Sequence, residues 1–384
     1  MLDLLLNADV YAPKHVGRRH LLVGGGTILY LGEEQPAVRG PDVRVTDLDG
    51  LRLIPGLIDG HAHLTGGGGE AGPESKVPPP PISTFTSAGV TTAVGVLGTD
   101  DLTRTTAELA ARVRALRAEG LSAYCHTGGY HLPPTTLTGS VRSDIVHLDC
   151  VLGAGEIAIA DHRSSQPTFE EVARLASEAH VAGLMTGKAG IVHFHVGDGP
   201  SGLALLRRCL DETEIPARVF NPTHVNRRKG LFTEACDLTK RGCTIDVTAF
   251  PKQSDDEWSA AEALRRFLDL GLPAERITVS SDAGGCLPTF DADGRVVSMG
   301  VGSPGALMDT VRELLRARRP LEAVLPAFTS NVAALLRLPR KGRIDEGMDA
   351  DFVVLDGGDG VRDVMARGRW HVRAHEQVVR GAFE

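Results

Sequence analysis

Short apolar runs alternate with amphipathic stretches through most of the chain. Helical patterns such as residues 102–120 and 168–183 lie between the apolar runs, and each ends at a glycine. Eight strand–helix repeats between residues 56 and 338 are the number found in a closed barrel, so the pattern predicts an α/β fold with a TIM-type (β/α)8 barrel. The eight predicted strands are GLIDGHAHL, VTTAVGVLG, SAYCHTG, EIAIAD, IVHFHV, ARVFNPTH, CTIDVTA and RITVSSD.

The two ends of the chain have a different pattern, in which short β-branched and apolar runs are broken by Gly, Asp and Asn. Such runs predict short strands joined by turns. We predict that residues 1–55 and 339–384 form one small β-sandwich domain built from both chain ends, beside a barrel of residues 56–338. The loop after the first barrel strand holds GGGG at 66–69 and VPPPP at 77–81, and loops at this end of a barrel carry function.

Composition narrows the class of protein. A chain of 384 residues with 42% hydrophobic and 23% charged residues has the composition of a globular protein with a sizeable core. Its formal net charge is -8 and it has no run rich in Lys and Arg, which argues against nucleic acid and anionic membranes as partners. The first residues lack the basic segment of a signal peptide. The six cysteines are scattered, which is typical of reduced thiols in a cytoplasmic protein.

Candidate chemistry begins at the end of the first barrel strand. His61 and His63 are two residues apart, so in a strand both side chains point to the same face. Two converging imidazoles suit a borderline metal such as zinc, although a single His-x-His pair is also common in ordinary cores. Four further side chains of ligand type lie in later strands, namely Glu156, His195, His224 and Asp282.

The recurrence of these side chains at matching strand positions favours a metal site. Buried carboxylates are costly unless they are paired or bound to a metal. Six ligands exceed the needs of one tetrahedral zinc ion with an open position, so we predict two divalent metal ions that share a bridging carboxylate. Such ions lower the pKa of a bound water and polarise the scissile carbonyl. Asp282 would accept the proton of that water and pass it to the departing amine.

Several segments of the chain resemble one family along its whole length, from the N-terminal β segment to the final RGAFE. They are LIPGLIDGHAHLTGGGGEAGP, GVLGTDDLTR, TGGYHLPPTTLTGSVRSDI, ADHRSSQP, FHVGDG, PTHVNR and SSDAGG. These motifs are similar to those of the isoaspartyl (β-aspartyl) dipeptidases of the amidohydrolase superfamily. The pairing of GGGGEAGP with TGGYHLP is far more specific than the His-x-His pair. The family's composite β domain and (β/α)8 barrel agree with the architecture predicted above.

The resemblance implies a division of the metal ligands. His61 and His63 would bind one metal ion together with Asp282, and His195 and His224 would bind the other. It also implies a small peptide substrate and assembly into a homo-oligomer.

The resemblance further implies residues that recognise the substrate. Tyr130 would donate a hydrogen bond to the developing oxyanion, as preorganised donors do. Glu70 would recognise the free α-amino group, whereas Arg163 and Arg227 would hold the two carboxylates, a task suited to the guanidinium fork. Outside matching motifs, each arginine is more simply explained as a surface ion pair. The aspartyl pocket would be completed by Gly68 and Thr99.

The sequence departs from the family pattern at two positions. The family's fourth strand usually carries a carbamylated lysine that bridges the metals, and Glu156 stands there in this chain. A glutamate is shorter than a carbamylated lysine by roughly 3–4 Å, so the strand and metals shift, water fills the gap, or only one metal binds tightly. Lys188 is the nearest later lysine and is expected in a loop. Cys286 replaces the usual serine of the substrate pocket, and a thiol is the weaker donor.

Three hypotheses of function follow from these residues. The first is metal-dependent hydrolysis of the isopeptide bond of β-aspartyl dipeptides. The second keeps the metal chemistry for another N-acyl amino acid, cyclic amide or β-linked peptide, and it is motivated by Glu156 and Cys286. The third is a non-catalytic relative that binds a metal or ligand, and the presence of Asp282 and Tyr130 argues against it.

Overall fold

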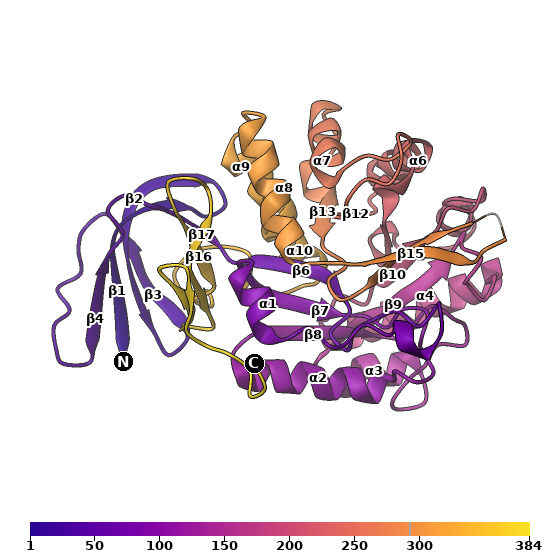
Figure 1. Cartoon of the computed structure of the whole chain (residues 1–384), viewed down its shortest axis with the longest axis horizontal. Helices are drawn as coiled ribbons and strands as arrows, with labels where there is room; N and C mark the ends of the chain where they lie inside the picture. The colour runs from indigo at the N-terminus through magenta and orange to yellow at the C-terminus, as the bar shows by residue number, and fades with distance from the viewer. Residues whose placement is uncertain (292) are drawn as a thin grey trace.

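The chain forms two separate assemblies of strands, one from its two ends and one from its middle (Figure 1). The computed structural model describes residues 1–291 and 293–384. In Figure 1 the indigo strands of the N-terminal segment and the yellow strands of the C-terminal segment lie together on one side, while the helices gather around the strands of the middle segment. None of the helices in these described ranges combines the length and the apolar character that crossing a membrane requires.

The first assembly is a mixed sheet of nine strands. Its path runs β19-β18-β17-β16-β5-β1-β2-β3, and β4 pairs with β1 beside β5. The two chain ends join where β5 pairs antiparallel with β16, which sets Pro55 opposite Phe352. The strands are β1 (Leu2–Tyr11), β2 (His15–Gly24), β3 (Thr27–Gly32), β4 (Val43–Asp47), β5 (Arg52–Pro55), β16 (Phe352–Leu355), β17 (Val361–Ala366), β18 (Arg369–Arg373) and β19 (Glu376–Gln377).

This sheet has a core of its own. Buried side chains from both chain ends share it, among them Leu21 of β2, Leu53 of β5 and Phe352 of β16. The ring of Trp370 packs edge-on against Phe352 and donates a hydrogen bond to Asp3 Oδ1 (3.0 Å). Apolar burial shared in this way makes each chain end depend on the other for its stability.

The second assembly consists of eight parallel strands, and these match the eight predicted from the sequence. Six form one sheet in chain order, and the last two pair with each other. The segment after β13 lies beside the end of β6, where Ala283 and Ala62 form a parallel bridge. The strands are β6 (Leu57–Ala62), β7 (Val90–Gly95), β8 (Ser122–Thr127), β9 (Val151–Ile159), β10 (Val192–Val196), β11 (Phe220–Thr223), β12 (Ile245–Thr248) and β13 (Ile277–Ser280).

Helices follow most of these strands, and their ends have clear sequence causes. A capping box formed by Thr168 and Glu171 begins α4, and a left-handed Gly187 ends it. The α-helices are α1 (Ile82–Ser87), α2 (Thr106–Glu119), α3 (Val141–His147), α4 (Phe169–Thr186), α5 (Ala204–Glu212), α6 (Lys229–Lys240), α7 (Ala260–Asp269), α8 (Gly305–Arg316), α9 (Leu321–Val324) and α10 (Ser330–Leu335). Short 3-10 turns are η1 (Pro73–Ser75), η2 (Ala217–Val219), η3 (Val225–Arg227), η4 (Ala274–Arg276) and η5 (Leu325–Phe328).

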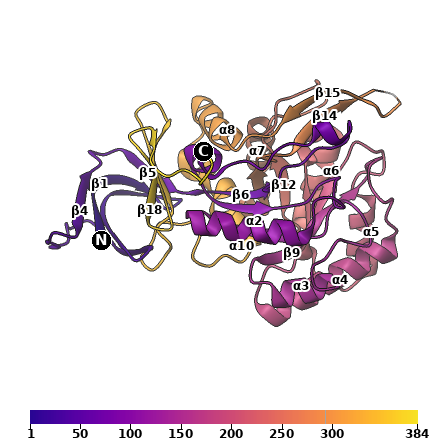
Figure 2. The same ribbon diagram turned by 60° about the horizontal axis from the view of Figure 1, so that its bottom comes forward.

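Three details differ from the sequence prediction. The fourth strand begins at Val151, so Glu156 lies within β9 instead of opening it. Helix α4 continues through Gly183, which packs directly against the backbone of Gly190 and therefore has no room for a side chain. An antiparallel hairpin of β14 (Cys286–Phe290) and β15 (Val296–Val301) projects from the end of the parallel strands (Figure 2).

Candidate metal centre and substrate cavity

Six side chains of ligand type converge at the carboxyl ends of the parallel strands. His61 lies in β6, and His63 follows it by two residues on the same face. Backbone hydrogen bonds from Asp282 to His61 (3.1 Å) and from His63 to Ala283 (2.7 Å) hold the ends of β6 and β13 together. The six buried side chains are His61, His63, Glu156, His195, His224 and Asp282.

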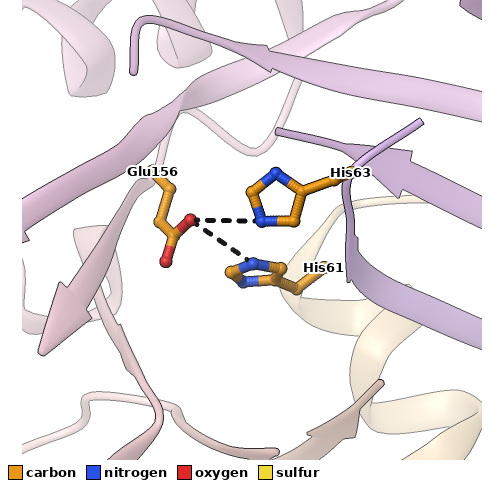
Figure 3. A group of neighbouring side chains, drawn as sticks. All are labelled: His61, His63 and Glu156. Carbon is orange, nitrogen blue, oxygen red and sulfur yellow. Dashed lines mark ion pairs between the residues drawn. The ribbon is translucent and has the colours of Figure 1, made fainter. Parts of the chain in front are cut away.

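Glu156 lies between two pairs of histidines. Its Oε2 atom is 3.4 Å from His61 Nε2 and 3.8 Å from His63 Nε2, as Figure 3 shows. Its Oε1 atom is 2.7 Å from His195 Nδ1 and 3.0 Å from His224 Nε2. The short glutamate therefore contacts all four imidazoles. The two oxygens of one carboxylate face two different ligand groups.

Asp282 completes the group around the first pair. Its Oδ1 atom lies 3.1 Å from His63 Nε2 and 3.4 Å from His61 Nε2. The backbones of Asp282 and His224 are both left-handed, with φ of 54° and 61°. A left-handed backbone costs a residue other than glycine about 1–3 kcal/mol and is commonly found at functional sites. Both strands therefore end in a strained turn that directs a side chain into the site.

Four atoms of this cluster have no hydrogen-bond partner among the described residues. They are His61 Nε2, His63 Nδ1, Glu156 Oε2 and Asp282 Oδ1, and all are buried. Three of them, His61 Nε2, Glu156 Oε2 and Asp282 Oδ1, converge on the same space. Buried polar atoms without partners are costly. A divalent cation among them would remove that cost, so the donor set fits a metal ion.

The possible ligand groups overlap. Within the described ranges, three sets of residues have ligand atoms within 4.8 Å of one another. Glu156 belongs to two of these sets, one with His61 and His63 and the other with His195 and His224. Imidazole and carboxylate ligands of this kind suit zinc and related divalent ions.

The charges in the cluster also favour a bound cation. Burial opposes the ionisation of Glu156, yet the charge of His61 holds the pKa of this carboxyl well below its usual range. Burial likewise opposes a charge on His61, but Glu156 and Asp282 raise the pKa of this imidazole to about 9. Burial lowers the pKa of His224 to about 3. The carboxylates are thus ionised at neutral pH and need a positive charge between them, which a proton on His61 or a bound cation can supply.

Tyr130 lies over the second pair of histidines. Its hydroxyl is 2.8 Å from His195 Nδ1, and its ring faces the Arg163 guanidinium at 5.3 Å. Burial, together with the charge of Glu156, raises the pKa of Tyr130 well above its usual value. The phenol therefore keeps its proton and can donate a hydrogen bond.

The expected substrate residues line a cavity of about 570 Å³ above the cluster. Glu70 accepts hydrogen bonds there from the Thr99 hydroxyl (3.0 Å), the Cys286 thiol (2.9 Å) and Arg163 Nη1 (3.3 Å). Burial and the nearby Glu70 raise the pKa of Cys286, so this thiol is a neutral donor. The cavity is also lined by His63, Gly68, Tyr130, His195, Arg227 and Asp282.

Arg227 lies further out than the other substrate candidates. It is the last residue of η3, the 3-10 turn that begins directly after His224, and its Nε atom is 3.9 Å from Asp198 Oδ1. Its partner Asp198 is mostly exposed, so the pair holds the arginine only weakly. The guanidinium is therefore free to turn toward an anionic group in the cavity.

Two glycines allow the chain to pass close to His63. A Cβ on Gly98 would lie 2.8 Å from His63 Cε1, and a Cβ on Gly285 would lie 2.2 Å from Asp282 Oδ1. Any side chain at either position would displace a ligand candidate. These two glycines are part of the site although they carry no chemistry.

Asp161 is a site residue that the sequence analysis did not identify. Its Oδ2 atom accepts hydrogen bonds from His195 Nε2 (2.9 Å) and Arg163 Nη2 (2.8 Å), and its Oδ1 atom accepts from Arg163 Nε (3.0 Å). One carboxylate thus holds both the imidazole of His195 and the guanidinium of Arg163 in place. The signal was present in the ADHR motif, where Asp161 stands two residues before the arginine that it holds.

Two more polar residues, His193 and Asn221, lie behind His61. His193 Nε2 is 2.8 Å from His61 Nδ1, and His193 Nδ1 is 2.6 Å from Asn221 Oδ1. The i, i+2 spacing of His193 and His195 in IVHFHV was a signal for the first of them. Lys188 lies away from the site, since its ammonium donates to the backbone of Ile145 (2.6 Å).

Comparisons with known proteins identify the family of the chain. A β-aspartyl dipeptidase from the thermophilic, keratin-degrading Fervidobacterium islandicum AW-1, solved in complex with a β-Asp-Leu dipeptide, is 41% identical over 98% of this chain and 97% of that chain, with a TM-score of 0.93. A second structure of this dipeptidase has 39% identity over 98% of both chains and a TM-score of 0.90. Dihydropyrimidinase from Brevibacillus agri NCHU1002 has a similar fold at 15% identity, with a TM-score of 0.69 over 100% of this chain and 97% of that one. The model of the amidohydrolase family matches residues 52–371, which is most of the sequence. The chain belongs to the amidohydrolase family.

Proposed function

We propose that the protein hydrolyses the isopeptide bond of β-aspartyl (isoaspartyl) dipeptides, with Asp282 as the proton shuttle. The observation that carries this proposal is the position of Glu156, whose two oxygens face different pairs of histidines beside Asp282. The cavity above this cluster is lined by Glu70 and by arginines that include Arg163 and Arg227, which suits a substrate with both an ammonium group and carboxylates. Similarity to β-aspartyl dipeptidases over nearly the whole chain supports the choice of substrate.

The proposal includes two divalent metal ions, zinc in the first instance. His61, His63 and Asp282 would hold one ion, and His195 and His224 would hold the other, with Glu156 as the carboxylate shared by both. When bound, such ions supply the activation of a water molecule and the polarisation of an amide carbonyl. The unpartnered ligand atoms and the need for positive charge near Glu156 support this assignment.

Two protein side chains would transfer the proton and stabilise the oxyanion. Asp282 is ionised and reaches the cavity, so it can accept a proton from the attacking water and deliver it to the leaving amine. Tyr130 keeps its proton and donates to the oxyanion that forms as the carbonyl is attacked. Both groups touch the reacting atoms and are the proposed catalytic residues.

Substrate recognition uses the charged groups of the cavity. Glu70 would bind the α-ammonium group, with Thr99 and Cys286 holding its carboxylate in place. Arg163 and Arg227 would bind the two substrate carboxylates, and Gly68 would form part of the aspartyl pocket. The bidentate contact of Arg163 with Asp161 supports this role, because it fixes the direction of the guanidinium.

The finer architecture is also a proposal. We propose that the eight parallel strands close into a (β/α)8 barrel of residues 56–338, which the contact of Ala62 with Ala283 supports. Residues 1–55 and 339–384 would then form a small β-sandwich domain, supported by the core that both chain ends share. We further propose a homo-oligomer in the cytoplasm, and the six free thiols of the described chain are consistent with that compartment.

The direct test uses the purified full chain loaded with zinc. We expect it to release aspartate from a panel of β-aspartyl dipeptides and to leave the α-linked isomers intact, and we expect two metal ions per chain by elemental analysis. A panel of N-acyl amino acids and cyclic amides is assayed in parallel. Cleavage of these compounds in place of the β-aspartyl panel would support the second hypothesis, and zinc binding without turnover would support a non-catalytic relative.

A further inference from the structure

A line of hydrogen bonds leads away from the proposed metal centre through the neighbouring strands β10 and β11 to the residue before β12. His61 Nδ1 lies 2.8 Å from His193 Nε2 in β10, and His193 Nδ1 lies 2.6 Å from Asn221 Oδ1 in β11. Asn221 Nδ2 in turn donates to the backbone carbonyl of Thr244 (2.7 Å), just before β12. These side chains are buried. We call His61, His193, Asn221 and the Thr244 carbonyl the histidine relay.

The chemistry of its last member fixes the direction of every bond in the relay. The Thr244 carbonyl can only accept, so the amide nitrogen of Asn221 faces it and the amide oxygen faces His193. That oxygen also can only accept, so His193 carries a hydrogen on Nδ1. No carboxylate contacts His193 among the described residues, and an imidazole ring with its one hydrogen on Nδ1 accepts at Nε2. His61 must then carry a hydrogen on Nδ1.

The relay therefore determines whether Nε2 of His61 can bind a metal ion. When a bound cation takes the place of the Nε2 hydrogen, the hydrogen kept on Nδ1 leaves the lone pair of His61 Nε2 directed toward Glu156 and Asp282, each 3.4 Å away. This nitrogen has no hydrogen-bond partner in the described part of the chain. We propose that His193 and Asn221 are positioning residues that hold His61 in the tautomer able to bind a metal ion. This inference rests on the proposed metal centre, because it concerns how His61 is prepared for it.

The positioning is needed because the local charges favour the wrong tautomer. The carboxylates of Glu156 and Asp282 attract a hydrogen onto Nε2 of His61, where it would block a metal ion. The bond to His193 opposes this by giving the Nδ1 hydrogen a buried acceptor, and a buried donor left without an acceptor is unfavourable. Second partners of metal-binding histidines commonly act in this way.

His126 supplies a matched control beside the relay. Its ring stacks on that of His193, with centroids 5.6 Å apart and planes inclined by 21°. It is buried to the same degree, but neither of its ring nitrogens has a hydrogen-bond partner among the residues that the structure describes. Replacing it makes a change of similar size in the same place without removing a hydrogen bond of the relay.

The test measures zinc affinity of the full chain by competition with a chromophoric chelator. We expect His193→Leu to weaken zinc binding about 10–100-fold, which is the usual loss when the second partner of a metal ligand is removed. His126→Leu should stay within about threefold of wild type, because no metal-orienting bond is lost. His193→Gln should also stay close to wild type, since its amide oxygen can accept from His61 Nδ1.

A second variant removes the hydrogen-bond partner of His193 at the other end of the relay. Asn221→Ala leaves both histidines in place but frees His193 to carry its hydrogen on Nε2, which would then face His61 Nδ1. We expect about tenfold weaker zinc binding, and this variant decides the question if His193→Leu does not fold. Equal zinc affinity in Asn221→Ala, His193→Leu and His126→Leu would overturn the positioning role while leaving the metal centre intact. A wild-type protein that binds no zinc would instead overturn the proposed function and the relay with it.

Discussion

The parallel strands carry a cluster of buried charge at each end. At the amino ends, the ammonium of Lys341 contacts Asp349 (2.8 Å), Asp351 and the hydroxyl of Ser122 (2.6 Å), the first residue of β8. Burial opposes a charge on Lys341, but Asp351 and Asp349 raise its pKa. Arg340 also contacts Asp349, so two cations balance the two carboxylates. This cluster needs nothing from outside the chain.

The cluster around Glu156 at the carboxyl ends is built from similar groups but is not complete. Four of its buried atoms have no hydrogen-bond partner in residues 1–291 and 293–384. Both clusters are buried, so burial alone does not separate structure from function. The difference is whether the charges are balanced and the polar atoms paired. A cluster that satisfies itself stabilises the fold, whereas one whose unpaired atoms converge is suited to bind a ligand.

The largest expected effect comes from breaking the incomplete cluster. Asp282→Asn keeps the shape of the side chain but cannot shuttle a proton, so kcat/KM for a β-aspartyl dipeptide should fall about 10²–10⁴-fold. Steady-state assays measure this loss, and circular dichroism of the same sample checks that the variant is folded. Activity close to that of wild type would contradict the role of Asp282.

Breaking the complete cluster should affect stability and leave catalysis unchanged. Lys341→Met leaves the buried carboxylate of Asp351 without its cation, and loss of one partner of a buried pair costs about 3–5 kcal/mol in the free energy of unfolding. Denaturant titration measures it, and kcat/KM per folded molecule should match that of wild type.

Arg340 offers a control for that variant. It also contacts Asp349 (2.8 Å), but its side chain is 55% exposed. Arg340→Met should therefore cost less than about 1 kcal/mol. Equal stability of the two variants would mean that burial does not distinguish these ion pairs.

The smallest expected effect concerns Glu70, whose carboxylate shares one property with each cluster. It has protein partners yet lines the cavity, and one of those partners is the weak donor Cys286. A hydroxyl donates more strongly than a thiol, so Cys286→Ser should lower KM for a β-aspartyl dipeptide about twofold to fivefold, whereas Cys286→Ala should raise it by a similar factor, as expected for roughly 0.5–1 kcal/mol. Equal KM values in the three proteins would remove Cys286 from substrate binding.

The sequence predicted those parts of the fold that depend on local pattern. Eight apolar runs predicted eight parallel strands, and the spacing of His61 and His63 predicted two imidazoles on one face. The hairpin β14–β15 was not predicted, because its strands are half exposed and Pro288 lies within one of them.

The parts of the site that the sequence missed depend on contacts between distant segments. His193 meets His61 across 132 positions of the chain, and Asp161 meets His195 across 34. Local periodicity in the sequence does not predict contacts between such distant residues. Strand position and motif resemblance indicated the residues that we propose to bind substrate or metal, but they did not reveal the side chains that orient those residues.

The pairing of β5 with β16 has a consequence for the order in which the chain matures on the ribosome. About 300 residues separate these partners, so at roughly 5–20 residues per second the first strands wait about 15–60 seconds for the last ones to be made. During that interval Leu53 and its neighbours lack the cover that Phe352 later provides. The newly made N-terminal segment is therefore the stretch on which a chaperone would act, and the final step of maturation is the closing of this sheet.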